Sequence, residues 1–349
     1  MKNLIRKSVQ ALDGYVPGEQ PKGEAIIKLN TNENPYLCSA EVHDILHEID
    51  VSVLSKYPDP LCVEVRKVIA EKHEVGVGNV FAGNGSDELL ALFIRAFVER
   101  DGGSVGYFDP SYSLYPVLAQ IEDVETRPVA LDENFGWQMP AGYEASLFFL
   151  TNPNAPTSML FPKEKVEAFV KDFPGVVVID EAYVDFAKEN CMEFATKYDN
   201  VIVARTLSKS YALAGIRFGY CVGNKELIDA LYKIKDSYNL NTITQELARV
   251  ALLDEGTMAA LTAVVKGSRD LFARELADLG FKVYPSETNF LWVKAPKPGA
   301  KKIFEELRNR NVFTRWFDGA RTKDYLRITV GTNEQMLDLV GNLEEIFGK

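Results

Sequence analysis

The sequence is poor in cysteine and histidine, with four and three of them among 349 residues. The cysteines are widely scattered, without a CxxC pair or dense spacing, which argues against a disulfide framework and a zinc site and favours reduced, cytoplasmic thiols. Two histidines, His43 and His47, have the i, i+4 spacing that can hold a metal, but Val42, Ile45 and Ile49 form an apolar helical stripe beside them. We therefore expect no metal site.

The sequence also lacks a long uncharged hydrophobic run. Its N-terminus has no continuous apolar core of the kind found in signal peptides, and no later run is long enough to span a bilayer. The 39 basic and 50 acidic residues give a net charge of −11, which argues against nucleic acid or an anionic membrane as a partner. We expect a cytoplasmic protein that takes small molecules, anionic ones included, in a local arginine-lined pocket.

What the chain does have is enough apolar sequence, 46% of its residues, for one large domain and a smaller one. Strand-like runs alternate with helical patterns, which is typical of an α/β fold. We expect a large domain with a mostly parallel central sheet flanked by helices, plus a smaller α+β domain. The predicted limits are an N-terminal arm over residues 1–25, the large domain over 26–250 and the small domain over 251–349.

Several strand-like runs end in polar residues. The predicted strands are 104–108, 147–150, 176–179 and 201–204 in the large domain and 290–293 and 325–330 in the small one, with helices over 89–97 and 261–279. In open α/β sheets the ligand crevice lies beyond the carboxyl ends of the strands. The polar groups that follow these strands should therefore converge.

Lys209 follows the strand-like run 201–204 and lies among the hydroxyls of Thr206 and Ser208, with Arg217 eight positions on. A lysine there is poorly placed for solvation. It could form a Schiff base with a carbonyl cofactor, while the hydroxyls and the arginine hold a phosphate. Taken alone, the motif fits an ordinary loop lysine as well.

Asp180 comes directly after four β-branched residues, 29 positions before Lys209, which leaves room for one crossover connection and a return strand. The two side chains could then meet in one crevice. An aspartate that faces the ring nitrogen of a pyridine cofactor keeps that nitrogen protonated. Tyr183 is placed to bond the phenolic oxygen of such a cofactor if a turn begins there. The segment 180–183 could instead simply cap a helix.

The segment 83–88, Gly-Asn-Gly-Ser-Asp-Glu, precedes the predicted helix 89–97. Ser86 is a good N-cap, and the glycines let the backbone approach a ligand, so free N–H groups could hold a phosphate here. A capped helix after a glycine turn is the simpler alternative, and the acidic Asp87 and Glu88 favour it because they already complement the helix dipole.

These motifs occur together and in order. They are 29–35 (LNTNENP), 86–88 (SDE), 152–157 (NPNAPT), 180–183 (DEAY), 206–217 (TLSK to Arg217) and 326–332 (LRITVGT). The set resembles the fold-type-I pyridoxal-phosphate aminotransferases, and among them most closely the histidinol-phosphate aminotransferases. The resemblance extends from about residue 15 to the C-terminus.

The resemblance implies a role for each matching residue. Lys209 would carry pyridoxal 5′-phosphate as a Schiff base and shuttle the substrate proton. Asp180 would pair with the pyridine nitrogen, Tyr183 would contact the phenolic oxygen, and Tyr112 would stack on the ring. The residues implied at the cofactor phosphate are Gly85, Ser86, Thr206, Ser208 and Arg217, together with Tyr57 from the other subunit of a homodimer.

The resemblance also implies a substrate site. Arg327 matches the family's carboxylate-binding arginine, and Arg315 matches a position that helps to bind the substrate phosphate. Tyr15 on the N-terminal arm would close over that phosphate, and Asn32 joins the substrate-binding set.

The chain departs from the family pattern at two positions. Relatives often carry an asparagine that bonds the cofactor's phenolic oxygen where this chain has Ala155, and a glycine where it has Ser158. Either Asn154 takes the role of that asparagine, or the contact is lost and Tyr183 alone tunes the oxygen.

The function implied is transfer of the amino group between L-histidinol phosphate and 2-oxoglutarate or glutamate, in L-histidine biosynthesis. Two close alternatives share the fold and cofactor, an aromatic amino-acid aminotransferase and a phosphothreonine decarboxylase. A more distant alternative is a pyridoxal-phosphate-binding regulator. That protein would need a DNA-binding module, and no basic segment or spare length supports one.

Overall fold

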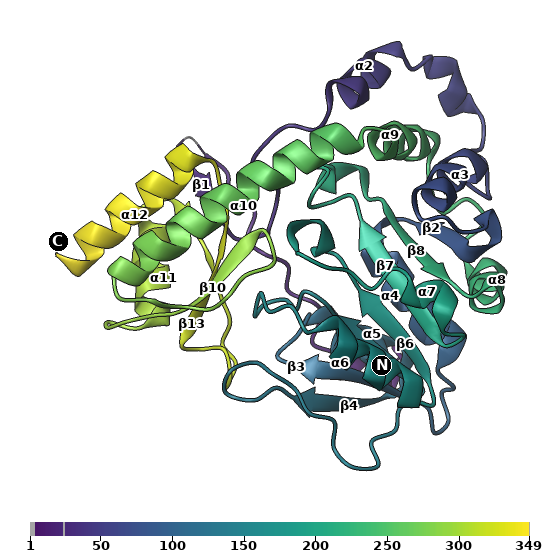
Figure 1. Ribbon diagram of the computed structural model, residues 1–349, viewed down its shortest axis with the longest axis horizontal. Coiled ribbons are helices and arrows are strands. Elements are labelled where there is room, and N and C mark those ends of the chain that lie inside the picture. Colours follow the sequence, from purple (N-terminus) through teal and green to yellow (C-terminus); the bar gives the residue numbers. More distant parts are fainter. Residues whose placement is uncertain (1–3, 24, 349) are drawn as a thin grey trace.

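Sheets of seven, four and two strands organise the chain, as seen in a computed structural model that describes residues 4–23 and 25–348. Figure 1 shows the larger sheet and its helices on the right and a smaller body at the left, with the long helix α10 (Glu255–Asp278) running across both. This division fits the predicted combination of a large and a small domain.

The central sheet has seven strands in the order β2-β8-β7-β6-β5-β3-β4. Their bounds are β2 Val80–Gly83, β3 Ser104–Asp109, β4 Glu125–Ala130, β5 Leu147–Thr151, β6 Val176–Asp180, β7 Val201–Thr206 and β8 Gly219–Gly223. The pairings of β8 with β2 and β7 are antiparallel, and the other pairings are parallel. The prediction of a mostly parallel sheet is confirmed.

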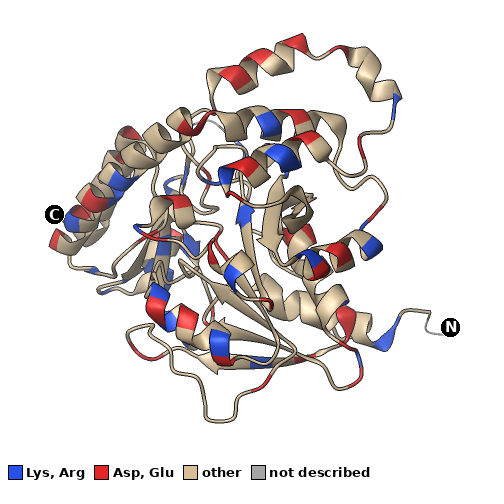
Figure 2. Ribbon diagram, turned by 45° about the vertical axis from the view of Figure 1, so that its right-hand side comes forward, with Lys and Arg blue, Asp and Glu red and all other residues tan. Residues whose placement is uncertain are grey.

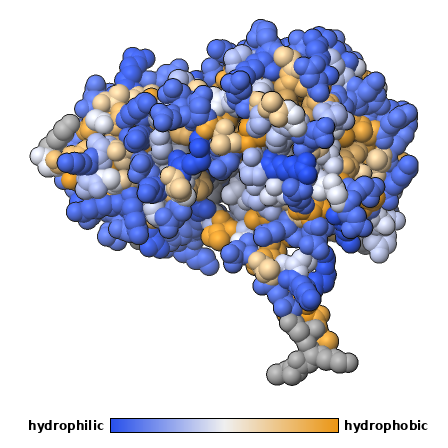
Figure 3. All heavy atoms as spheres, turned by 90° about the horizontal axis from the view of Figure 1, so that it is seen from below, coloured by the Kyte–Doolittle hydropathy of each residue, from blue (hydrophilic) through white to orange (hydrophobic). Residues whose placement is uncertain are grey.

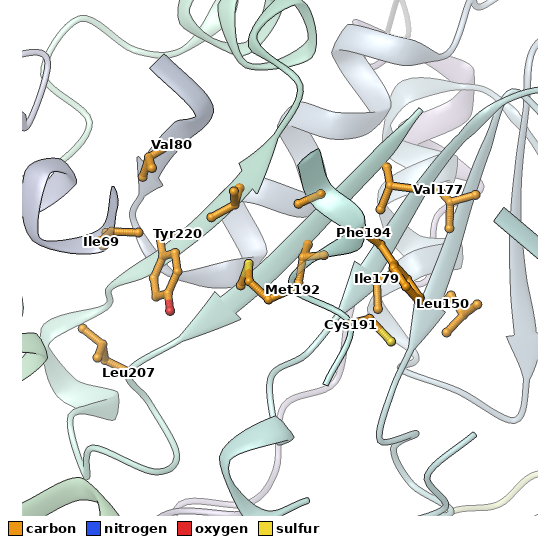
Figure 4. Close-up of a cluster of buried hydrophobic side chains, with 14 of the residues drawn as sticks. Ile69, Val80, Leu150, Val177, Ile179, Cys191, Met192, Phe194, Leu207 and Tyr220 are labelled. Atoms are coloured by element: carbon orange, nitrogen blue, oxygen red, sulfur yellow. The ribbon is translucent and has the colours of Figure 1, made fainter. Parts of the chain in front are cut away.

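Both faces of this sheet are buried, because side chains alternate between the two faces along each strand. In β6, Val177 and Ile179 belong to one apolar cluster and Val178 to the other. Figure 4 shows Val177 and Ile179 beside Leu150 of β5, near Phe194.

Helices cover each face. The first cluster includes residues of α2 (Ala40–Glu48), α3 (Val63–Lys72), α6 (Lys163–Asp172), α7 (Phe194–Lys197) and α9 (Thr242–Leu253). The second includes residues of α4 (Gly85–Phe97), α5 (Leu114–Glu122) and α8 (Lys225–Ile234). The carboxyl ends of the parallel strands remain free of these helices at one edge, where a ligand site is expected.

The smaller body is built on an antiparallel sheet in the order β12-β13-β10-β9. Its elements are β9 Lys282–Val283, β10 Phe290–Lys294, β12 Arg315–Trp316, β13 Tyr325–Thr329, and the helices α11 Ala300–Asn309 and α12 Asn333–Phe347. The α+β composition predicted for the C-terminal part is therefore observed.

The N-terminal segment joins the small body rather than the large sheet. Strand β1 (Ile27–Lys28) pairs in parallel with β11 (Val312–Phe313), and Leu29 lies in the apolar core of the small body. At the other limit, Ala251 and Leu252 pack in the core of the large sheet. Residues 27–29 thus pack with the small body and residues 251–252 with the large sheet, a few residues beyond each predicted limit. The limits at residues 26 and 250 stay predictions.

The remaining elements are short. They are α1 Lys7–Gln10 and the 3₁₀ turns η1 Val51–Ser55, η2 Val77–Asn79, η3 Val184–Phe186 and η4 Ala214–Ile216. All the strands and both helices expected from the apolar patterns are present, with ends shifted by a few residues. The expectation that Ser86 caps α4 is wrong. The N-cap is Asn84, whose N–H is bonded by the Glu88 carboxylate, and Ser86 is the second helical residue.

The surface is polar and carries charges of both signs. Figure 2 shows lysine and arginine intermixed with aspartate and glutamate along the outer helices. The face in Figure 3 is mostly hydrophilic with scattered apolar patches, and the start of the described chain projects from it. Within residues 4–23 and 25–348, no helix has the length and apolar character needed to cross a membrane.

Candidate active site

A cavity of about 290 Å³ lies where the large sheet meets the small body. Its wall includes twelve of the fifteen residues expected at the site: Tyr15, Asn32, Ser86, Tyr112, Asp180, Tyr183, Thr206, Ser208, Lys209, Arg217, Arg315 and Arg327. The polar groups that follow the strands therefore converge, as the topology predicts.

Lys209 lies three residues beyond the end of β7. Its Nζ donates to the carbonyl oxygen of Thr31 at 3.3 Å, and no carboxylate of the described chain forms an ion pair with it. Burial, with a smaller contribution from the positive charge of Arg327, lowers the pKa of the Lys209 amine to about 8. An amine in this state is a far better nucleophile and base near neutral pH than a surface lysine.

Asp180 is the last residue of β6 and is almost fully buried. One carboxylate oxygen accepts the Tyr115 hydroxyl proton at 2.7 Å, and the other accepts the Ala182 N–H at 3.1 Å. Burial raises the pKa of Asp180 to about 6, while these two donors oppose the rise. The carboxylate lies on the cavity wall without a cationic partner among the described residues.

Tyr183 begins the turn η3, as expected if Asp180 is followed by a turn rather than a helix. Its hydroxyl accepts the side-chain N–H of Asn32 at 2.9 Å, and its ring packs edge-on against Phe290. Asn32 is itself fixed, because its carboxamide oxygen accepts the Thr329 hydroxyl. The Tyr183 hydroxyl thus keeps its own proton available for a ligand.

A second part of the cavity has the features of a phosphate cradle. The backbone N–H groups at the start of α4 have no helical partners, and Ser86, Thr206, Ser208 and Arg217 line the same wall. Gly85 has φ +80°, and a Cβ there would lie 2.6 Å from the Arg217 guanidinium. The nearest carboxylate, on Asp87, is 3.4 Å from that guanidinium in an exposed and therefore weak pair.

Arg327 on β13 is a partly buried cation without a carboxylate partner among the described residues. Its Nη2 donates to the Asn30 carbonyl oxygen at 2.9 Å, but its Nε has no hydrogen-bond partner. The guanidinium lies 5.4 Å from the Phe290 ring centre and 5.5 Å from that of Phe317. An uncompensated, partly buried cation is costly, so this group has room and reason to bind an anion.

Arg315 connects the small body to the N-terminal arm. It donates to the carbonyl oxygens of Val16 and Pro17 at 3.2 and 3.4 Å. Tyr15 lies next to them, with its ring 6.1 Å from that of Tyr112 in an edge-on contact. The arm therefore reaches the cavity, as the position of Tyr15 in the sequence suggested.

Three expected residues are not on the cavity wall. Gly85 lies behind the cradle, and Tyr57 is 81% exposed and stacks on Tyr238 instead. Asn154 is fully buried away from the cavity, where its amide donates to Pro110 and Thr157 and accepts from Ser111. Its groups are used by these contacts, so they leave none for a ligand, and Ala155 lines the wall in its place.

A larger hollow of about 560 Å³ lies elsewhere, near the ends of α4 and α5. Two of its arginines, Arg95 and Arg100, already pair with Glu122. It holds no lysine or buried carboxylate of the kind found in the smaller cavity. The chemistry therefore belongs to the smaller one.

Sequence reasoning missed two residues at the site. Thr151 ends β5 on the cavity wall, and Tyr115 lies behind Asp180. Thr151 could have been found, since it follows the predicted strand 147–150. Tyr115 carries a weaker signal, its position one helical turn after Tyr112, and an aromatic residue at that spacing is usually core.

The residues present fit pyridoxal 5′-phosphate. The cradle at α4 offers unpaired N–H groups, three hydroxyls and Arg217 to a phosphate, at a place where only glycine leaves room. Asp180 offers a buried carboxylate to a ring nitrogen, Tyr183 a hydroxyl proton to an oxygen, and Lys209 an amine of lowered pKa to a carbonyl carbon.

Comparisons with known proteins agree with this assignment. The model of the aminotransferase class I and II family matches residues 24–343. Histidinol-phosphate aminotransferase 1 of Trichormus variabilis is 40% identical over 350 residues, which cover 99% of this chain and 100% of that protein.

Solved structures extend the likeness to the fold. Histidinol-phosphate aminotransferase of Sinorhizobium meliloti, in complex with pyridoxal-5′-phosphate, superposes with a TM-score of 0.89 at 25% identity over 100% of this chain and 98% of that one. L-threonine-O-3-phosphate decarboxylase of Porphyromonas gingivalis, with a TM-score of 0.80 over 92% of this chain and 99% of that one, is 22% identical and shows the fold alone. The chain therefore belongs to the pyridoxal-phosphate-dependent class I and II aminotransferases and, within them, to the histidinol-phosphate aminotransferase family.

Proposed function

We propose that this enzyme transfers the amino group between L-histidinol phosphate and 2-oxoglutarate or glutamate, as a step of L-histidine biosynthesis. The observation that carries the proposal is Arg327, a partly buried arginine with no carboxylate partner among the described residues, in the same cavity as Lys209 and Asp180. Both substrates carry a negatively charged group, so the site needs a cation that binds it, here Arg327. It also needs an amine that can react and carry a proton, here Lys209. The cavity combines them.

The cofactor, when bound, supplies a protonated pyridine ring that withdraws electrons from the substrate carbon. The Asp180 carboxylate holds the proton on the ring nitrogen, because an ionised acid at that atom favours the charged ring. The Tyr183 hydroxyl, oriented by Asn32, donates to the phenolic oxygen. The phenol ring of Tyr112 lines the same cavity and would limit the orientations open to the pyridine ring of the cofactor.

Lys209 moves the substrate proton. Its Nζ would accept the proton from the α-carbon of the substrate and later give it back to a different carbon. The amine must be neutral when it accepts the proton. The lowered pKa of about 8 meets that requirement near neutral pH. The contact with the Thr31 carbonyl oxygen restricts where the amine can move.

Substrate binding falls to the arginines and the arm. Arg327 presents the planar fork that suits the carboxylates of 2-oxoglutarate and glutamate. Arg315 and Tyr15 lie together at the arm and are proposed for the phosphate of histidinol phosphate. For that role, Arg315 would exchange two backbone carbonyl oxygens for a phosphate, which is a stronger partner for a guanidinium.

A homodimer is part of the proposal. Tyr57 does not reach the cavity of its own chain, although the resemblance gives it a place at the cofactor phosphate. It lies in a segment with several exposed apolar side chains: Leu37, Leu46, Val51, Leu54 and Leu61. Such a group of exposed apolar residues marks an interaction surface, and a second copy of the chain would cover it.

The cytoplasmic location and the absence of nucleic-acid and membrane partners stay predictions. The location rests on the four scattered cysteines, which are free thiols in the structure. The argument about nucleic acid rests on the acidic net charge.

A donor screen tests the proposed substrate. Purified enzyme with pyridoxal phosphate would receive histidinol phosphate, phenylalanine, tyrosine or phosphothreonine, each with 2-oxoglutarate, and glutamate and carbon dioxide would both be measured. We expect histidinol phosphate to give the largest kcat/KM, with glutamate formed and no carbon dioxide. Preference for an aromatic amino acid, or release of carbon dioxide from phosphothreonine, would replace the proposal with that alternative.

A further inference from the structure

A chain of hydroxyl groups leads from the Asp180 carboxylate through the buried Tyr115, which does not line the cavity, to Thr151 and Ser111, which do. The Tyr115 hydroxyl lies 2.7 Å from one Asp180 oxygen and 2.6 Å from the Thr151 hydroxyl. Thr151 in turn lies 3.1 Å from the Ser111 hydroxyl, which donates to the Asn154 carboxamide oxygen at 3.0 Å. The three hydroxyl groups, of Tyr115, Thr151 and Ser111, have no part in the roles proposed above.

The direction of the hydrogen bonds in this chain is fixed when Asp180 is ionised. A carboxylate only accepts, so Tyr115 must give its single proton to Asp180. The Tyr115 oxygen then accepts the proton of Thr151, and the single proton of Ser111 is left to be shared between the Thr151 oxygen and the Asn154 carboxamide oxygen. Each bond in such a series strengthens the next, because a hydroxyl that accepts becomes a better donor.

Tyr115 cannot easily move away from this position. It is fully buried, its ring stacks on Phe149 with centres 4.5 Å apart and planes 8° apart, and Tyr112 meets it edge-on at 5.6 Å. It does not line the cavity, so it touches neither cofactor nor substrate. Its hydroxyl contacts two groups that do line the cavity, the Asp180 carboxylate and the Thr151 hydroxyl.

Among the described residues, no cation stabilises the charge of the Asp180 carboxylate in place of the Tyr115 hydroxyl. Within the described residues, Asp180 has no lysine or arginine partner, and Glu181 beside it is neutralised by Arg205 at 2.8 Å. The titratable groups around Asp180 are Tyr115 of α5, Tyr112 just before that helix, Asp87 of α4, and Glu181 and Tyr183 in its own segment, while Lys209 shares the cavity. Asp87 and Glu181 disfavour its charge, and the hydroxyl of Tyr115 favours it.

We propose that Tyr115 is a positioning residue, whose buried hydroxyl, backed by Thr151, keeps the Asp180 carboxylate ionised and oriented towards the cavity for the ring nitrogen of the cofactor. This inference rests on the proposed role of Asp180. It predicts that removal of one hydroxyl outside the cavity changes how cofactor binding depends on pH.

The test compares Tyr115→Phe with the wild type in the binding of pyridoxamine 5′-phosphate, measured by isothermal titration calorimetry from pH 5.5 to pH 9. This probe has the ring nitrogen and the phosphate but no carbonyl carbon for Lys209. Loss of a hydrogen bond to a charged group raises the midpoint of Asp180 ionisation by about one pH unit or more. The dissociation constant should therefore be about five- to tenfold weaker than that of the wild type at pH 5.5, and within about twofold at pH 9.

The matched control is Tyr107→Phe. Tyr107 on β3 is a half-buried tyrosine whose ring lies 6.2 Å from that of Tyr115, and it does not line the cavity. We expect its binding curve to follow the wild type at every pH. If Tyr115→Phe fails to fold, Thr151→Val serves in its place, with Thr151→Ser as its control, and should give a smaller weakening in the same direction.

The outcomes separate the two proposals. Weakening by the same factor at all pH values means that Tyr115 only packs, and the inference is then wrong. Wild-type protein that does not bind pyridoxamine phosphate would contradict the cofactor assignment itself, whatever Tyr115 does. The role of Tyr115 is supported if the dissociation constant of Tyr115→Phe, divided by that of the wild type, falls to about one at high pH.

Discussion

The desolvation of Lys209 lowers the stability of the folded protein and also makes its amine reactive. A lysine is charged in the unfolded chain at neutral pH, whereas here its amine is desolvated and lies near the Arg327 and Arg217 cations, whose effect the carboxylates of Glu33 and Asp87 oppose. Burial therefore disfavours its charge, and the protein pays for a reactive amine with part of its folding free energy. The same desolvation that lowers the pKa makes the amine available for reaction.

The cost of Lys209 can be measured in the cofactor-free protein with Lys209→Met. The pKa of Lys209 is about 8 in the folded protein and near 10.5 in the unfolded chain, so the unfolded state binds more protons between these values. Wild-type stability must therefore rise with pH across that window. We expect Lys209→Met to be more stable than the wild type by about 2 kcal/mol at pH 7, and by less than about 1 kcal/mol at pH 10.

Urea denaturation at the two pH values measures this difference. Lys302→Met, an exposed position on α11, is the control and should change stability little at either pH. A gain for Lys209→Met that is equal at pH 7 and pH 10 would mean that the amine is solvated in the folded protein.

At the scale of the element, the start of α4 is the part that the phosphate site depends on. The helix begins where β2 ends and the antiparallel β8 starts, and the backbone of Gly85 lies so close to Gly219 that a Cβ on Gly219 would come within 2.8 Å of it. This close approach brings Ser86 and Arg217 to one wall. The acidic first turn of the helix does not prevent anion binding, because the N–H groups of that turn remain unpaired.

Gly85→Ala tests this element. The alanine Cβ would adopt an unfavourable φ of +80° and would displace the Arg217 guanidinium, which lies 2.6 Å away. We expect pyridoxal 5′-phosphate to bind at least about tenfold more weakly, since charged hydrogen bonds of this kind contribute roughly 1.5–3 kcal/mol. Pyridoxal, which has no phosphate, should lose less than about twofold.

Gly102→Ala is the matched control. Gly102 has φ +87° but open space around its Cβ position, so it carries the same backbone strain without the contact. Its variant should lose some stability and keep its cofactor affinity. Equal losses of pyridoxal and pyridoxal phosphate in Gly85→Ala would indicate a general distortion rather than a phosphate site.

Local patterns predicted the elements better than the contacts between them. Short continuous apolar runs were enough for β3, β5, β6 and β7, and the polar residues that follow them were correctly expected in one crevice. The pairing of β1 with β11 joins residues almost 300 positions apart, which no local pattern encodes. Asn154 was misplaced for a related reason, since its buried contacts with Pro110 and Ser111 depend on two loops meeting.

At the scale of the whole molecule, the proposed dimer bears on whether one chain forms a complete cofactor site. Tyr57 stands on an exposed apolar segment and stacks on Tyr238, with ring centres 4.4 Å apart. Under the proposed dimer, each cofactor phosphate is held by Arg217 of one chain and Tyr57 of the other. Neither chain alone then forms a complete site.

Mixed dimers test this arrangement directly. Lys209→Ala removes the reactive amine, and Tyr57→Phe removes only a hydroxyl while it preserves the stack on Tyr238. In a mixed dimer of the two variants, one site carries both lesions and the other carries none if Tyr57 acts across the interface. We expect such dimers, purified with two different tags, to show about half of the wild-type activity at limiting pyridoxal phosphate, with wild-type cofactor affinity at the active site.

If Tyr57 acts within its own chain, the only site with Lys209 also lacks the Tyr57 hydroxyl, and the mixed dimer should bind the cofactor as weakly as the Tyr57→Phe homodimer. Light scattering on the wild type supplies the remaining condition, because a monomer at micromolar concentration would contradict a shared site.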